Sequence, residues 1–393
     1  MYNEVLVGQY LKLLGFNGLN NLPKSSLTQL SSWLSHNEER KNSYRDQWGN
    51  WDYPFTMNDF TKPYTDIFAK GLVNEIQSSW PKNAPFAICL THDLDNITSS
   101  AHPPIAINNL KKRIFLSKNR KMKFFDQISL MKQIVKKNIF TTQNNPLWRF
   151  EDWLSLENSF GFKSTFFVFV RPDYGDALSI YDCNYNPNDL LVFDGVKMKA
   201  KDFWEELHQR GFEVGLHGSY HSSSNKNILQ KQKNILEDSI SSNVISTRQH
   251  YLHYDINTTP SIHSQCGIKV DSTLGFNRTI GFRAGTSFPY ELLDSKGKET
   301  GVWEIPQIIM DGALFAPNAL ELNVDLAVKH SLKIMDQVEN VGGCLTLNFH
   351  PEYIINDKYW NTYKIILQEA KRRGAYNNTV GGIYNYIQNK FIR

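Results

Sequence analysis

Residues 85–96 read PFAICLTHDLDN, and this stretch decides the fold. It begins as an apolar run with the length of a buried strand and stops abruptly in a cluster of polar residues. The same pattern recurs at 213–221 (EVGLHGSYH) and at 344–351 (CLTLNFHP). Because the carboxyl ends of parallel strands gather on one face of a sheet or barrel, we expect these polar residues to share one pocket.

The chain after Pro85 predicts an α/β domain. Short apolar runs alternate there with helical patterns, as in repeated strand-helix units around a parallel sheet or barrel. The runs lie at 86–90, 165–170, 213–216, 247–252, 302–310 and 344–349. Residues 1–84 show helical patterns and a Trp/Asn/Asp-rich stretch, QWGNWDYPF, at 47–55. We therefore expect a mainly helical N-terminal region of unknown role followed by an α/β domain at 85–393.

The composition excludes several classes of protein. The 393 residues are 41% hydrophobic and 21% charged, which is typical of a globular protein and not of a disordered or fibrous one. No apolar run approaches the roughly 18 residues of a spanning helix. The N-terminus has an acidic Glu4 and no basic region ahead of an apolar stretch, so we expect a cytoplasmic protein. The four cysteines form no CxxC pair, which argues against a thiolate zinc site and a disulfide framework.

Positive charge is concentrated in one segment. Residues 111–137 hold ten Lys or Arg and one acid, Asp126, interleaved with apolar residues as in a basic amphipathic helix. We expect a helical insertion at about 99–148. Its basic face is either solvated or in contact with a membrane or polyanion. Nucleic-acid binding is not expected, because the chain shows no nucleic-acid-binding motif.

Two histidines four residues apart suggest metal chemistry. Gly215 and Gly218 around His217 favour a strand end followed by a turn, with His221 on that turn. Two neutral imidazoles and a carboxylate leave one zinc position open, which is the pattern of a catalytic site. Taken alone, the pair fits ordinary hydrogen-bonded histidines somewhat better than metal ligands.

The two aspartates of THDLD strengthen the hypothesis of a metal site. Residues i and i+2 of an extended strand point to the same side, so Asp93 and Asp95 can face one pocket together. One carboxylate can ligate a cation while the other accepts a proton from water. The alternative is a turn-forming D-x-D sequence before Asn96. We interpret His92 as a hydrogen-bonding residue of the strand end.

Four stretches in this order resemble the successive motifs of the polysaccharide deacetylases with a NodB-homology domain. They are THDLD at 91–95, STFFV at 164–168, HGSYH at 217–221 and LNFHP at 347–351. The resemblance covers roughly residues 86–355, interrupted by the basic insertion. It implies a deformed (β/α) barrel and metal-dependent hydrolysis of an N-acyl group on a sugar.

The resemblance also implies roles for individual residues. Asp95, His217 and His221 would ligate a divalent metal, for which we expect Zn²⁺. Asp93 would be the general base and His350 the general acid. In the commoner form of the family the two aspartates are adjacent, whereas here Leu94 separates them in a D-x-D form.

The family places an arginine near the base, and this chain offers two. Arg248 lies in TRQHYL and Arg283 in GFRAGTSFPY. A guanidinium beside Asp93 would keep it ionised, whereas any arginine can instead form a surface ion pair. Asp311 is a candidate for orienting His350 through its ring nitrogen.

The expected activity is hydrolysis of a non-peptide carbon-nitrogen bond in an N-acylated carbohydrate, with acetyl as the expected acyl group. The alternatives are a deformylase of a lipid-linked formamido sugar and a catalytically silent carbohydrate-binding relative. A cytoplasmic enzyme would act on a biosynthetic sugar, free or lipid-linked. The basic segment 111–137 would suit a phosphate-bearing lipid carrier at the inner membrane face.

Overall fold

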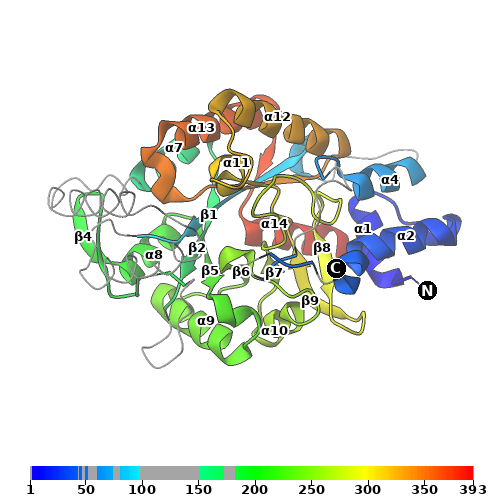
Figure 1. Ribbon diagram of the computed structural model, residues 1–393, viewed down its shortest axis with the longest axis horizontal. Helices are drawn as coiled ribbons and strands as arrows, with labels where there is room; N and C mark the ends of the chain where they lie inside the picture. The colour runs from blue at the N-terminus through cyan, green and yellow to red at the C-terminus, as the bar shows by residue number, and fades with distance from the viewer. Residues whose placement is uncertain are drawn as a thin grey trace.

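A curved sheet forms the centre of the computed structural model (Figure 1). The structure describes residues 2–392 except 43, 47, 48, 52–59, 74–79, 98–149, 172–181 and 184. The predicted basic insertion at 99–148 therefore lies outside the described residues. None of the helices in the described part of the chain is both long and apolar enough to cross a bilayer.

In the described part of the chain the central sheet has ten strands, and every pairing in it is parallel except that of β8 with β9. They are β1 (Ala87–Leu94), β2 (Ser164–Phe169), β5 (Glu213–Gly218), β6 (Ser246–Gln249), β7 (Val270–Asp271), β8 (Tyr290–Leu293), β9 (Glu299–Glu304), β10 (Ile309–Met310), β11 (Cys344–Asn348) and β12 (Tyr376–Asn377). Their order is β10-β11-β1-β2-β5-β6-β7-β9-β8, with β12 beside β1 and β8 antiparallel to β9. Two further strands, β3 (Leu190–Phe193) and β4 (Val196–Lys199), form a separate hairpin.

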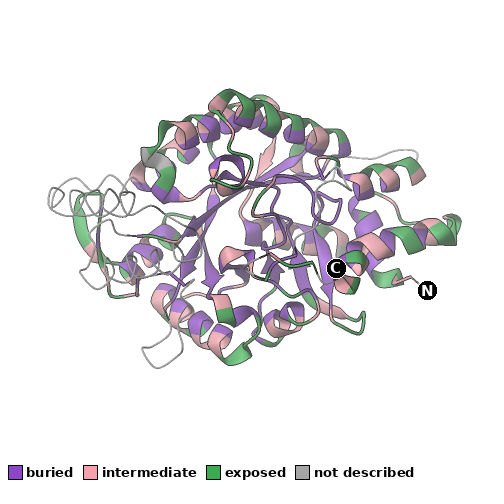
Figure 2. Cartoon of the chain, viewed as in Figure 1, coloured by how far each residue is buried: buried purple, intermediate pink, exposed green. Residues whose placement is uncertain are grey.

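Helices follow the strands and cover the outside of the sheet (Figure 1). They are α7 (Phe150–Phe160), α8 (Ala200–Gln209), α9 (Lys226–Ile240), α10 (Thr259–Gln265), α11 (Asp311–Phe315), α12 (Val324–Val341), α13 (Asp357–Arg372) and α14 (Val380–Ile387). Short turns of helix are η1 (Leu19–Asn21), η2 (Pro81–Asn83), η3 (Tyr220–Ser223), η4 (His250–Leu252), η5 (Pro351–Ile355) and η6 (Gln388–Ile392). Figure 2 shows buried strands inside and exposed outer helix faces.

Helix α12 illustrates how the local sequence specifies these elements. The Asn323 side chain caps the first turn by accepting a hydrogen bond from the backbone NH of Leu326. Buried residues recur every three or four positions, and Gly342 ends the helix in the left-handed conformation. The helix thus has one apolar face, which packs on the sheet.

The predicted α/β class and the deformed barrel are confirmed. Each apolar run expected to form a strand contains one, and the run at 302–310 splits into β9 and β10. Pro306 lies between them and has no backbone NH to donate to a ladder. Within the described residues the strand path is open, with β10 and β8 at its two ends, so the barrel is incomplete.

The N-terminal region is helical where it is described and packs on the β8 side of the sheet (Figure 1). Its helices are α1 (Glu4–Leu13), α2 (Lys24–Leu34), α3 (Asn37–Lys41) and α4 (Tyr64–Leu72). Leu6, Leu30 and other residues of these helices share one hydrophobic core with Tyr290 and Val302 of the barrel. Burial of this common apolar surface ties the region to the strands that follow β6.

Candidate active site

The carboxyl ends of β1, β5, β6 and β11 meet at one edge of the sheet. The register pairs Thr91 of β1 with Asn348 of β11, and His217 of β5 with Arg248 of β6. Asp93, near the end of β1, is only 3% exposed. The strand ends therefore bring together the residues that the sequence pattern predicted to share a pocket.

Three side chains at this edge form a group that could hold a metal ion. Asp95, His217 and His250 each offer a donor atom, and these atoms lie within 4.8 Å of one another. Oδ1 of Asp95 is 3.2 Å from Nε2 of His217 and 3.4 Å from Nε2 of His250. The set comprises two imidazole nitrogens and one carboxylate oxygen, which suits Zn²⁺ and leaves a further coordination position open.

The hydrogen bonding of His217 fits this interpretation. Its Nδ1 lies 3.0 Å from the backbone carbonyl of Arg248, a geometry in which Nδ1 carries the proton and donates. Nε2 then bears a lone pair and is buried, and none of the described residues gives it a hydrogen-bond partner. A lone pair facing the Asp95 carboxylate is repelled by it, whereas a cation shared by both groups would satisfy them.

Asp95 has the ionisation state that a metal ligand needs. Burial alone would raise the pKa of its carboxyl group. The charges of His250 and His350 and the two imidazoles within 3.4 Å of the carboxylate outweigh burial and hold the pKa of Asp95 well below its ordinary value. The carboxylate is therefore anionic at neutral pH, as cation binding requires.

His221, which the resemblance implied as a ligand, lies outside this group. After β5 the chain enters η3, which leaves His221 exposed and its ring 5.3 Å from that of Tyr220. His250 is the third donor because β6 lies beside β5 and ends directly before it. The sequence carried a signal for His250, since it follows a strand at the same end as the other polar residues.

Asp93 is held as an ionised carboxylate. Its Oδ1 accepts a hydrogen bond from Nη1 of Arg248 at 3.0 Å, and its Oδ2 accepts one from Nδ2 of Asn348 at 2.8 Å. Burial alone would raise the pKa of Asp93, but the charges of Arg248, His217 and His350 outweigh it and lower the pKa. The group is thus an anion that can accept a proton.

The structure distinguishes between the two candidate arginines. Arg248 is fully buried beside Asp93 and also donates to Thr91 and Ser272. Arg283 instead forms an ion pair with Glu39 of α3, at 2.5 Å between Nη2 and Oε1, and donates to the carbonyl of Gly275. The loop carrying Arg283 faces the N-terminal helices, so Arg283 is an anchor for that region.

His350 and Asp311 form the predicted pair. Nδ1 of His350 is 2.7 Å from Oδ1 of Asp311, and the backbone NH of His350 donates to Oδ2 at 2.7 Å. Burial alone would lower the pKa of His350, but Asp311, and then Asp95 and Asp93, raise it well above its ordinary value. Nε2 lies 3.9 Å from Asp93 and 3.8 Å from Asp95, so a protonated imidazole faces both carboxylates.

The sequence pattern did not single out three other residues at the site. Asn348 holds Asp93, as described above. Glu352 accepts a hydrogen bond from Asn96, and burial and the charge of Asp95 raise its pKa to about 8. Cys183 Sγ lies 3.7 Å from Nε2 of His250. Asn348 ends β11, Glu352 lies in the short turn η5 and Cys183 in a loop, and no periodic pattern marks such positions.

Comparisons with known proteins show which structures share this fold. No protein-family model and no curated protein matches the sequence. A chain from Mycobacterium smegmatis assigned as a polysaccharide deacetylase superposes with a TM-score of 0.51 at 16% identity, covering 80% of this chain and 94% of that one. PuuE allantoinase superposes with a TM-score of 0.50 at 13% identity, covering 86% and 98%. The chain therefore has the NodB-like fold that the motifs implied.

Proposed function

We propose that the protein is a metal-dependent hydrolase that removes an N-acyl group from a carbohydrate. One observation carries the proposal. Nε2 of His350 lies within 3.9 Å of both Asp93 and Asp95, so an acid, a base and a candidate cation site meet at one point. Hydrolysis of an amide requires these three functions together.

Each group has a defined task in this reaction. Asp95, His217 and His250 would hold a divalent cation such as Zn²⁺, which when bound would supply the Lewis acidity that polarises an amide carbonyl and acidifies water. Asp93 accepts the proton of the attacking water at a carboxylate oxygen, and Arg248 keeps that carboxylate ionised and oriented.

His350 completes the reaction as the general acid. The departing amine must gain a proton before it leaves, and Nε2–H of His350 donates it. Asp311 holds the opposite ring nitrogen and stabilises the charged imidazole until the transfer.

The substrate class rests on the motif resemblance and the fold. The two superposed chains are named as a polysaccharide deacetylase and an allantoinase, and both names suit a pocket that cleaves a carbon-nitrogen bond. An N-acetylated biosynthetic sugar in the cytoplasm is the substrate we propose. A formamido sugar on a lipid carrier is the alternative, with the basic segment 111–137 as the contact to the carrier.

Metal analysis combined with product detection tests the proposal. The purified wild type is expected to hold one metal ion per chain and to release acetate from at least one N-acetylated sugar in a panel. His217→Ala is expected to lose the metal and the activity while keeping its circular dichroism spectrum. Release of formate alone would favour the alternative substrate. A folded wild type that binds no metal would instead support a carbohydrate-binding protein without catalysis.

A further inference from the structure

The chain passes from β6 into the short turn η4 at His250. Tyr251 and Leu252 have φ values of 60° and 53°, so two successive non-glycine residues adopt the left-handed conformation. This conformation is strained for residues with a side chain and persists only where surrounding contacts impose it. Such strain is concentrated at functional sites, and here it directly follows a residue of the candidate cation site.

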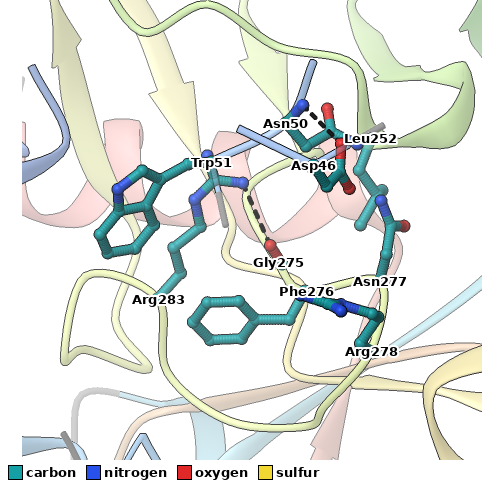
Figure 3. Close-up of a pocket in the computed structure, with 9 residues that line it drawn as sticks. All are labelled: Asp46, Asn50, Trp51, Leu252, Gly275, Phe276, Asn277, Arg278 and Arg283. Atoms are coloured by element: carbon teal, nitrogen blue, oxygen red, sulfur yellow. Dashed lines mark hydrogen bonds between the residues drawn. The ribbon is translucent and has the colours of Figure 1, made fainter. Parts of the chain in front are cut away.

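Two asparagine side chains hold the turn through one carbonyl group. The carbonyl oxygen of Tyr251 accepts hydrogen bonds from Nδ2 of Asn50 at 2.7 Å and from Nδ2 of Asn277 at 3.0 Å. Asn277 follows β7. Asn50 comes from the N-terminal region and lies 201 positions before Tyr251 in the chain. Both residues line one hollow together with Leu252 and Trp51 (Figure 3).

Asn50 is itself fixed in place. It is 4% exposed, its backbone NH donates to Oδ1 of Asp46 at 2.9 Å, and its carbonyl accepts from the NH of Asp46 at 2.8 Å (Figure 3). These two bonds tie Asn50 to Asp46, and the Asn50 amide is thereby a preorganised donor.

The two imidazoles of the cation site differ in how they are anchored. Nδ1 of His217 is bonded to a backbone carbonyl, which fixes its ring. Among the described residues, the ring nitrogens of His250 meet only Asp95 and the sulfur of Cys183, at 3.7 Å or more from the sulfur. The rings of Phe169, His217 and Tyr251 pack around the His250 ring, with centroids 6.2, 5.0 and 4.6 Å away. Since Tyr251 belongs to the turn itself, the direction of the His250 ring depends both on this packing and on the backbone that the turn sets.

We propose that Asn50 is a positioning residue of the cation site: by holding the carbonyl of Tyr251 it fixes the left-handed turn that aims His250 at Asp95 and His217. This inference rests on the proposed function, because it concerns the same site. It gives the N-terminal region a role in the chemistry, for which its sequence offered no indication.

Zinc affinity of the full-length protein tests the inference directly. Zn²⁺ is titrated against a competing chromophoric chelator for the wild type, Asn50→Ala and Arg45→Ala. Removing a residue that orients a ligand typically lowers metal affinity by about 10- to 100-fold, and we expect this loss in Asn50→Ala. Arg45→Ala is the matched control, since its described hydrogen bonds go to backbone carbonyls of its own segment. It is expected to bind Zn²⁺ like the wild type.

Three further variants keep the test decisive if Asn50→Ala does not fold. Asn277→Ala removes the second donor to the same carbonyl from the barrel side and is expected to weaken Zn²⁺ binding in the same range. His250→Ala is expected to abolish tight binding, whereas His221→Ala is expected to retain it.

The outcomes separate this inference from the proposed function. Wild-type affinity in folded Asn50→Ala, or in Asn277→Ala if the first is unfolded, would overturn the positioning role and leave the hydrolase intact. Retained binding in folded His250→Ala would likewise overturn it. A folded wild type that binds no Zn²⁺ would overturn the proposed function itself.

Discussion

Replacing Asp311 by asparagine tests how the general acid is kept protonated. Asp311 is fully buried and offers two oxygens to His350, one to the ring Nδ1 and one to the backbone NH, both at 2.7 Å. An asparagine has one carbonyl oxygen, so it can accept only one of these bonds and must direct its NH₂ group at the other donor. It also removes the negative charge that raises the pKa of His350.

The magnitude follows from the lost bond. A hydrogen bond to a charged group contributes about 1.5–3 kcal/mol, and about 1.4 kcal/mol corresponds to a factor of ten. At alkaline pH the protonated imidazole of His350 should therefore be about 10- to 100-fold less populated in Asp311→Asn than in the wild type. Because the pKa of His350 falls, the alkaline limb of turnover moves to lower pH, and turnover at mildly acidic pH changes least.

The assay is the pH profile of acid release from an N-acylated sugar, measured for the wild type, Asp311→Asn and Asp294→Asn. Asp294 accepts hydrogen bonds from backbone amides of a surface turn and serves as the control for a loss of charge. A folded Asp311→Asn enzyme whose alkaline limb coincides with that of the wild type would refute His350 as the proton donor.

Three other predictions follow from the same contacts. Asp93→Asn and His350→Ala should each lower turnover by about 10²- to 10⁴-fold while Zn²⁺ stays bound, as measured by kinetics and metal analysis; loss of metal in either would contradict the assigned roles. Glu352 has a pKa raised to about 8 in the folded state, so folding favours its protonated form. Between pH values of about 4.3, the ordinary pKa of a glutamate, and about 8, unfolding releases a proton from Glu352. The free energy of unfolding of the wild type should therefore fall as pH rises through that window. Glu352→Gln should flatten this decline in urea titrations at pH 5 and pH 9, and identical declines would exclude Glu352 as its source. Glu39→Ala should cost about 3–5 kcal/mol of unfolding free energy, because it leaves the guanidinium of Arg283 buried without its counter-charge; a change below 1 kcal/mol in urea unfolding would show that the ion pair is replaced by other contacts.

Local patterns in the sequence were sufficient to place much of the fold. Apolar runs of strand length and 3.6-residue periodicity are properties of consecutive residues, so β1, β5 and β11 could be located from them. The position of Asp93, His217 and His350 at strand ends followed from the same runs. Since parallel strands collect their carboxyl ends on one edge, convergence of these residues was predictable without coordinates.

Contacts between residues that lie far apart in the chain could not be predicted from local patterns. The spacing in HGSYH suggested His221 as a ligand, but η3 turns it outward, and His250 enters the group because β6 pairs with β5. Either arginine could have served Asp93 until the strand order set Arg248 beside it.

The sequence by itself determined the strand-helix alternation and the chemical type of each residue at the strand ends, because both depend on short-range periodicity and side-chain identity. Only the tertiary structure decided which donors share one point and that Asn50 holds the turn after β6. Those contacts join residues up to 201 positions apart, and their geometry is fixed by strand order and core packing, which no local pattern encodes.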